Sequence, residues 1–226
     1  MLISLTNWRR STGRRFLFWF FAIFCWVASF AQTSTVEKYD DAGGSGLYPF
    51  NFRVIDKTFM AGGYLFNPQK KQNSPEKVRE YLRLLKKMGA RSLILLHVPL
   101  KDLMTDQLEQ LCHEEKIDLL KVRMNSQQIP DAAQTVRILE LIDAGAYVHC
   151  MWGCDRTGAI IGRYLREKHA FSGRQAFEAV VGGGTHAGPL GGFKKVPANL
   201  NLLLYFWPEV SSEAPDIFAL YRAAKR

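Results

Sequence analysis

The 226-residue sequence has few cysteines, no block of basic residues and no residue spacing typical of a metal site. Its four cysteines show no disulfide framework. Its 30 basic and 21 acidic residues give a net charge of +9, without the lysine and arginine cluster that marks a nucleic-acid-binding surface. The GxxxxGK(S/T) loop of nucleotide-binding proteins is also missing. No metal, cofactor or nucleic acid is therefore expected.

The N-terminus lacks an apolar run of the ~20 residues that a membrane span requires. Two arginine pairs precede an uncharged, aromatic-rich run over residues 16–30, and small residues occupy the −3 and −1 positions of a cleavage site after Ala31. This pattern predicts an export signal over residues 1–31 and a periplasmic or secreted mature protein. An uncleaved N-terminal anchor is the alternative, and only then is membrane contact expected.

Cleavage would leave 26 basic and 21 acidic residues, a net charge of +5, which suits anionic substrates. It would also leave three cysteines, and an odd number indicates a reactive thiol. Residues 32–48 are polar and rich in glycine, so they are predicted to be a linker. The remaining residues, 49–226, are long enough for one globular domain with its own core.

Strand-like and helical patterns alternate along this domain. Strands are expected at 51–55, 58–61, 92–97, 117–124 and 146–149, and helices at 75–88, 105–112, 130–144, 159–170, 172–181, 200–207 and 214–224. This alternation predicts an α/β fold, with a central, mostly parallel sheet flanked by helices. The active site of such a sheet lies at the carboxyl ends of its strands.

The most informative stretch is His149-Cys150-Met151-Trp152-Gly153-Cys154-Asp155-Arg156-Thr157-Gly158. An apolar run leads into it, and a helical pattern leads out of it. A short loop between a strand and a helix N-terminus directs backbone N–H groups and the positive end of the helix dipole to one point, where a guanidinium fork can join them. With a thiolate at its base, this anion site becomes a nucleophile aimed at a bound phosphate.

The stretch resembles the H-C-x5-R-(S/T) signature of the cysteine-dependent protein tyrosine and dual-specificity phosphatases. With Asp155 before Arg156, it is most similar to the C-x-x-G-x-D-R-T-G subgroup, which includes atypical bacterial phosphatases and myotubularin-like lipid phosphatases. The resemblance implies a dual-specificity-phosphatase-like fold and phosphomonoester hydrolysis through a cysteinyl-phosphate intermediate.

The resemblance also assigns roles within the stretch. Cys150 is the expected nucleophile, Arg156 binds two phosphate oxygens, Thr157 hydrogen-bonds the sulfur and helps it leave, and His149 organises the loop. The expected phosphate-binding residues follow the nucleophile without a gap: Met151, Trp152, Gly153, Cys154, Asp155 and Arg156.

Three aspartates are candidates for the general acid that protonates the leaving oxygen. Asp155 is favoured because the subgroup uses the aspartate before the arginine. Asp131 is the only acid of the 124–131 loop, although helix capping explains it equally well. Asp118 has the separation from the cysteine seen in other family members, but it begins a strand.

Three classes of phosphorylated substrate remain open. The first and simplest is a phosphotyrosine protein, the second is a phosphoinositide, and the third is another small anionic phosphoester such as an inositol polyphosphate. Cys154 stands where the subgroup usually has lysine, which weakens the phosphoinositide hypothesis. The alternatives to a phosphatase are a non-catalytic phosphate-binding module and a rhodanese-like sulfur-transfer protein.

Further residues have two interpretations each. A Cys150–Cys154 disulfide would be a reversible off-switch, and Cys112 is either a core residue or a redox partner. His97 and His186 are either structural or close to the substrate.

Overall fold

The computed structural model describes residues 36–39, 43–67, 73–96, 103–184 and 193–222. The signal predicted over residues 1–31 lies outside them and stays a prediction, as do the roles of His97 and His186. No helix within the described ranges is long and apolar enough to cross a membrane.

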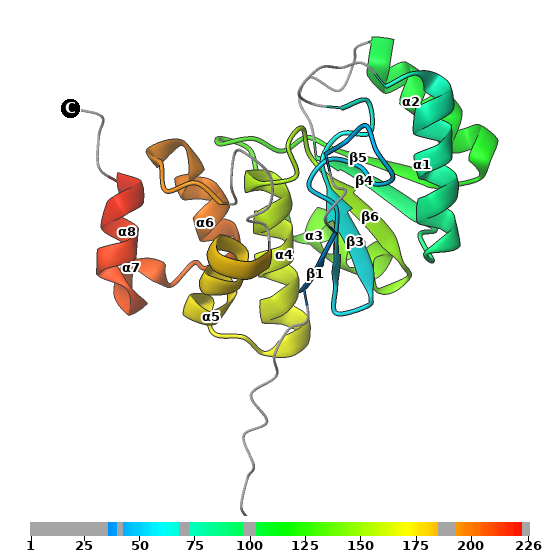
Figure 1. Cartoon of the computed structure of the whole chain (residues 1–226). Coiled ribbons are helices and arrows are strands. Elements are labelled where there is room, and N and C mark those ends of the chain that lie inside the picture. Colours follow the sequence, from blue (N-terminus) through cyan, green and yellow to red (C-terminus); the bar gives the residue numbers. More distant parts are fainter. Residues whose placement is uncertain (1–35, 40–42, 68–72, 97–102, 185–192, 223–226) are drawn as a thin grey trace, which may run out of the picture. The chain divides into compact units, whose positions relative to one another are not determined.

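A six-stranded sheet lies at the centre of the fold (Figure 1). Its strands are β1 (Val36–Lys38), β2 (Arg53–Ile55), β3 (Phe59–Gly62), β4 (Ser92–Leu96), β5 (Asp118–Val122) and β6 (Ala146–His149). In the order β1-β2-β3-β6-β4-β5, the first two pairings are antiparallel and the last three are parallel. The predicted α/β fold with a mostly parallel sheet is therefore confirmed, and the nucleophile strand β6 is central.

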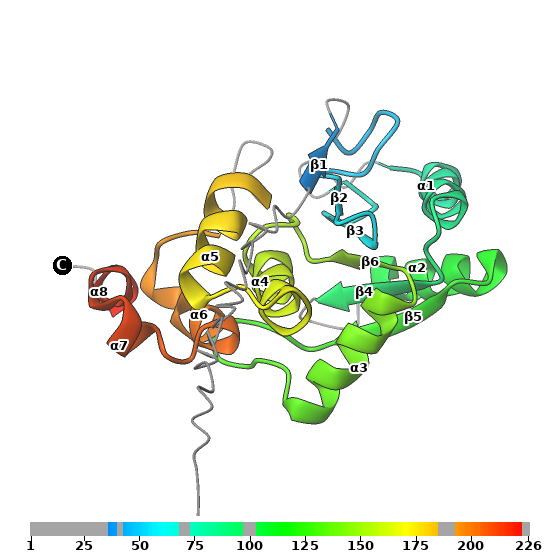
Figure 2. The ribbon, with the colours of Figure 1, turned by 90° about the horizontal axis from the view of Figure 1, so that it is seen from below.

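Helices cover both faces of the sheet (Figure 2). The helices are α1 (Pro75–Lys87), α2 (Leu103–Glu115), α3 (Ala132–Asp143), α4 (Asp155–His169), α5 (Gly173–Glu178), α6 (Leu200–Phe206), α7 (Val210–Glu213) and α8 (Pro215–Arg222). A π-helical turn (Ala179–Gly184) follows α5, and a 3-10 turn (Pro197–Asn199) precedes α6. Helices α1 and α2 lie on one face, whereas α3 and α4 lie on the other, with α5–α8 packed beyond α4.

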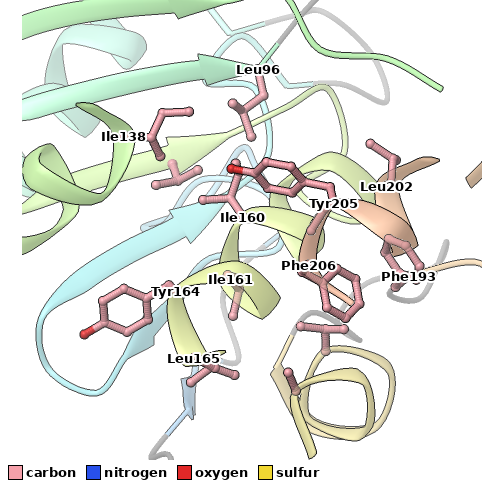
Figure 3. Close-up of a cluster of buried hydrophobic side chains, with 14 of the residues drawn as sticks. Leu96, Ile138, Ile160, Ile161, Tyr164, Leu165, Phe193, Leu202, Tyr205 and Phe206 are labelled. Atoms are coloured by element: carbon pink, nitrogen blue, oxygen red, sulfur yellow. The ribbon is translucent and has the colours of Figure 1, made fainter. Parts of the chain in front are cut away.

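The alternation of side chains along β4 divides the core in two. Leu93 and Leu95 belong to the cluster beneath α1 and α2, whereas Ile94 and Leu96 belong to the cluster beneath α3 and α4. Figure 3 shows the second cluster, where side chains of α4 and α6 meet Leu96 of β4. Cys150 belongs to this cluster, so the predicted nucleophile is on the α3–α4 side of the sheet.

The strands predicted at 51–55 and 58–61 are present as β2 and β3, which form a hairpin with Asp56 and Lys57 in its turn. Both turn residues have positive φ, 48° and 57°, as a tight hairpin turn that follows the strand twist requires. This hairpin places the end of β3 beside β6, because Gly62 of β3 is paired with His149.

The structure differs from the sequence prediction in the segment expected to be a linker, 32–48. Residues 36–38 form the edge strand β1, and Tyr48 stacks on Phe52 of the core with 5.0 Å between ring centroids. The Nδ2 atom of Asn73 also donates to the carbonyl of Gly44 over 2.6 Å. The folded domain therefore includes residues before 49.

A glycine on α4 sets the approach of α4 to α6. A Cβ atom at Gly162 would lie 2.9 Å from the ring of Phe206. We predict that Gly162→Val lowers the free energy of unfolding by about 1–3 kcal/mol. The added side chain would collide with Phe206 and force α4 and α6 apart, which would disturb their packing. Urea unfolding would measure this loss, with Glu167→Val at an exposed position of α4 as the control for helix propensity. Equal losses in the two variants would contradict the prediction.

Candidate active site

The His149–Thr157 stretch joins the end of β6 to the start of α4. The helix begins at Asp155, not at Ala159 as the apolar periodicity predicted, so Arg156 lies in the first helical turn. Cys154 is the N-cap residue, and its side chain makes no capping hydrogen bond. The N-cap side chain therefore occupies none of the first N–H groups of α4, and the helix dipole at this end favours an anion.

The loop is in direct backbone contact with the end of β3. Gly153 has a φ of +69°, and a Cβ atom there would lie 2.4 Å from the carbonyl carbon of Gly62. Any other residue would be strained in its backbone and would collide with the neighbouring chain. The amide of Tyr64 also donates to the carbonyl of Met151 over 3.1 Å. The curvature of the loop is thus fixed against the β2–β3 hairpin.

Cys150 is 3% exposed at the base of this loop. Burial alone raises the pKa of its thiol, but Arg156 and hydrogen bonds from the side chain and backbone of Thr157 and from the backbone of Trp152 outweigh burial and lower that pKa below the ordinary value. The loop therefore favours the thiolate, which is the nucleophilic form.

Arg156 is half-buried, and its Nη1 atom donates to the carbonyl of Leu96 over 2.9 Å. This bond ties the guanidinium to the carboxyl end of β4, next to the end of β6. Arg156 of α4, the predicted clamp, is thus bonded to the end of β4, and Cys150, the predicted nucleophile, follows the end of the adjacent strand β6. Both lie at the carboxyl ends of the strands, as expected for a parallel α/β fold.

His149 is completely buried. Its ring stacks on those of Tyr64 and Tyr147, with centroids 5.8 and 5.4 Å away. A histidine packed between two aromatic rings is placed to support the loop rather than to exchange protons with a substrate.

The other two cysteines that the structure describes, Cys112 and Cys154, have raised rather than lowered thiol pKa values. Burial raises the pKa of both Cys112 and Cys154 to about 12, so both are protonated thiols at neutral pH. Cys112 lies in the α1–α2 cluster, on the other face of the sheet from Cys150, which favours its interpretation as a core residue. All three are free thiols in this structure, and the Cys150–Cys154 disulfide remains a prediction about the oxidised protein.

The three candidate acids lie in different surroundings. Asp155 is half-buried in the first turn of α4, and its Oδ1 atom accepts from the amide of Lys194 over 2.7 Å. Asp131 is the N-cap of α3, where it forms a capping box with Gln134. Asp118 begins β5 and pairs with Ser92, at the edge of the sheet opposite to the carboxyl ends of the strands. Of the three, only Asp155 is part of the loop.

Two polar residues at the site were not singled out from the sequence. Asn51 and Arg53 are buried, and they hydrogen-bond the loop from the β2 side. The strand pattern carried a signal for one of them: Arg53 and Ile55 lie two positions apart on a short strand, so both face the core. An arginine at an inward position requires an acceptor inside the protein.

Trp152 lies half-buried at the outer side of the loop, where its ring meets that of Phe50 edge-on with 5.8 Å between centroids. In the described part of the chain, no group of three or more His, Cys, Asp or Glu residues is arranged to hold a metal ion.

No protein-family model and no curated protein matches the chain. Among solved structures, the chain is similar to TpbA of P. aeruginosa, with 13% identity and a TM-score of 0.47 over 76% of this chain and 91% of that one. PTPMT1 is 19% identical, with a TM-score of 0.46 over 71% and 96% of the two chains. A leucine-rich-repeat and phosphatase-domain protein from Entamoeba histolytica is 13% identical, with a TM-score of 0.43 over 70% and 91%.

Other structures of the first two proteins hold ligands, pTyr in TpbA and PI(5)P in PTPMT1.

The thiol pKa values predict selective alkylation. At neutral pH, iodoacetate should modify Cys150 first, because its pKa is lowered whereas those of Cys112 and Cys154 are about 12. The rate should rise with pH to a midpoint below 9.0, the ordinary thiol value, and Thr157→Val should move that midpoint upwards. Peptide mass spectrometry identifies the modified residue, and initial modification of Cys112 or Cys154 would refute the assignment.

Proposed function

We propose that the chain hydrolyses phosphomonoesters through a cysteinyl-phosphate intermediate, most simply as a protein tyrosine or dual-specificity phosphatase. The structural observation that carries this proposal is that Cys150 directly follows β6, at the base of a loop that leads into a helix whose first turn holds Arg156; these surroundings lower the pKa of its thiol. A buried thiol without such surroundings is inert, as Cys112 is, so the combination supports nucleophilic catalysis.

In the first step, the thiolate attacks phosphorus and forms an S–P bond while the P–O bond to the leaving group breaks. The loop amides and Arg156 bind the phosphoryl oxygens, whose charge they stabilise in the transition state. Asp155 gives its proton to the leaving oxygen. In the second step, water attacks phosphorus and Asp155 takes up its proton. The S–P bond then breaks to release inorganic phosphate and the thiolate, to which Thr157 donates a hydrogen bond.

An aryl phosphate is the substrate class that the described surface fits best. Trp152, which is half-buried, places an aromatic ring beside the loop, where it offers a phenyl ring edge and face contacts, and the buried Phe50 packs against it. We therefore favour phosphotyrosine over the phosphoinositide or inositol-polyphosphate alternative, and we propose an exported protein as its setting.

The purified protein in reducing buffer should hydrolyse p-nitrophenyl phosphate. Cys150→Ser should abolish turnover because the nucleophile is lost, and Arg156→Lys should reduce it strongly because lysine cannot bind two oxygens at once. Release of p-nitrophenol measures both effects, and Lys168→Met, at the far end of α4, is the matched control. An inactive wild-type protein that still binds phosphate would instead show the non-catalytic alternative.

Asp155→Asn should lower kcat by about 10²–10⁴. A general acid works in its protonated form, so kcat/KM of the wild type should show a basic limb, that is, a fall towards higher pH. The substitution should remove this basic limb. The loss should also be larger for phenyl phosphate than for p-nitrophenyl phosphate, whose leaving group needs less protonation. Parallel pH profiles of Asp155→Asn and Asp131→Asn decide between the two aspartates, and removal of the basic limb by Asp131→Asn alone would reassign the acid.

A further inference from the structure

A buried arginine, Arg53 of β2, lies against the anion loop and hydrogen-bonds it. Arg53 of β2 is fully buried, and burial lowers its pKa to about 10, so it remains charged at neutral pH. The electrostatic partners that raise its pKa again are Cys154, Tyr147 and Cys150, and no carboxylate of the described residues is among them. Burying a cation away from water is costly unless the protein replaces the lost solvation.

The guanidinium of Arg53 donates hydrogen bonds to two backbone carbonyl groups. Its Nη1 atom donates to the carbonyl of Asn51 and its Nη2 atom to that of Gly153, each over 2.7 Å. Asn51 adds a second contact to the same loop: its Nδ2 atom lies 3.2 Å from the carbonyl of Trp152 and 3.3 Å from both the carbonyl of Gly153 and the sulfur of Cys154. Two residues of one hairpin therefore hold three consecutive residues of the loop.

These contacts determine which way the loop amides point. In a planar trans peptide, the C=O of one residue and the N–H of the next point in opposite directions. The carbonyls of Trp152 and Gly153 are turned towards Asn51 and Arg53. The N–H groups of Gly153 and Cys154 consequently face away from the hairpin, on the side of the loop where a phosphate would be bound.

We propose that Arg53, assisted by Asn51, is a positioning residue that holds the 152–153 and 153–154 peptides with their N–H groups towards the phosphate and adds a second positive charge behind the Cys150 thiolate. This inference rests on the proposed phosphatase function, because it concerns the same loop. Arg156 is held on the β4 side of the loop by its hydrogen bond to the carbonyl of Leu96. Arg53 lies on the β2 side and donates to the carbonyl of Gly153.

The role of the fork and the role of the charge can be separated by two substitutions. Arg53→Met keeps most of the volume but removes both, whereas Arg53→Lys keeps the charge and cannot bind two divergent carbonyls. Arg166→Met is the matched control, because Arg166 also donates to a backbone carbonyl, that of Phe206 over 2.9 Å, but at the other end of α4.

Two measurements report on the loop without any turnover. Calorimetry of tungstate binding to the Cys150→Ser protein reports whether the loop amides are oriented to bind an anion. The pH dependence of Cys150 alkylation reports how strongly the loop stabilises the thiolate. Arg53→Met should weaken tungstate binding by about 10–100-fold, the range of a lost charge-assisted hydrogen bond, and should move the alkylation midpoint to higher pH. Arg53→Lys should restore the midpoint but not the affinity. Arg166→Met should change thermal stability only.

A folded Arg53→Met variant whose tungstate affinity and alkylation midpoint equal those of the wild type would overturn the proposal. If Arg53→Met does not fold, Asn51→Gly is the decisive variant. Glycine accepts the positive φ of 54° found at Asn51, so the substitution removes the side-chain amide without backbone strain. It should weaken tungstate binding by about 3–10-fold, and unchanged binding would overturn the proposal in that case.

The two proposals fail in different ways. A wild-type protein that binds tungstate in an Arg53-dependent manner but hydrolyses no phosphomonoester would contradict the proposed function and support the positioning role. A wild-type protein that hydrolyses p-nitrophenyl phosphate with tungstate affinity unaffected by Arg53→Met would contradict the positioning role and support the function.

Discussion

A thiolate held away from water at the centre of a sheet must be balanced by positive charge that the protein itself supplies. Cys150 sits at the end of the central strand β6, where burial opposes ionisation. The neighbouring parts of the fold provide the balance: the N-terminus of α4 lies directly after the loop, Arg156 is tied to the end of β4, and Arg53 extends from β2. This requirement explains why the strand order matters. Because β6 is central, a guanidinium can reach the loop from each side of it: Arg156 of α4 is tied to the end of β4, and Arg53 reaches the loop from β2, beyond β3.

The same requirement separates the three cysteines. Each is buried, yet burial raises the pKa of Cys112 and Cys154 to about 12, while that of Cys150 is lowered. The charge of Arg156 and the hydrogen bonds from Thr157 and Trp152 to Cys150 decide the difference. Cys154, only four residues away, bonds instead to the loop itself, with Asn51 as donor to its sulfur and the carbonyl of Trp152 as acceptor. Its thiol therefore belongs to the packing of the loop in this reduced state.

The sequence was most informative where the chemistry is local. The order of strands and helices follows from periodicity, and Cys150 and Arg156 are six positions apart in one motif. Contacts between distant segments could not be read in this way. Arg53 and Gly153 are 100 positions apart and meet only because β3 pairs with β6.

Two boundaries were also missed for physical reasons. The first turn of α4, Asp155-Arg156-Thr157-Gly158, is polar and lacks the apolar periodicity that indicates a helix. The edge strand β1 is three residues long and carries two charged residues, so its sequence lacks the alternation that indicates a strand.

The close contact between Gly153 and the Gly62–Gly63 backbone has a consequence for protein engineering. The anion loop is one half of a composite unit, and the β2–β3 hairpin is the other half. A graft of the ten-residue motif alone into a foreign sheet would bring Cys150 and Arg156, but not the surface that sets the loop's curvature. Transplantation would require both segments in their mutual register, and a circular permutation would preserve the unit only if its new termini lay outside both segments.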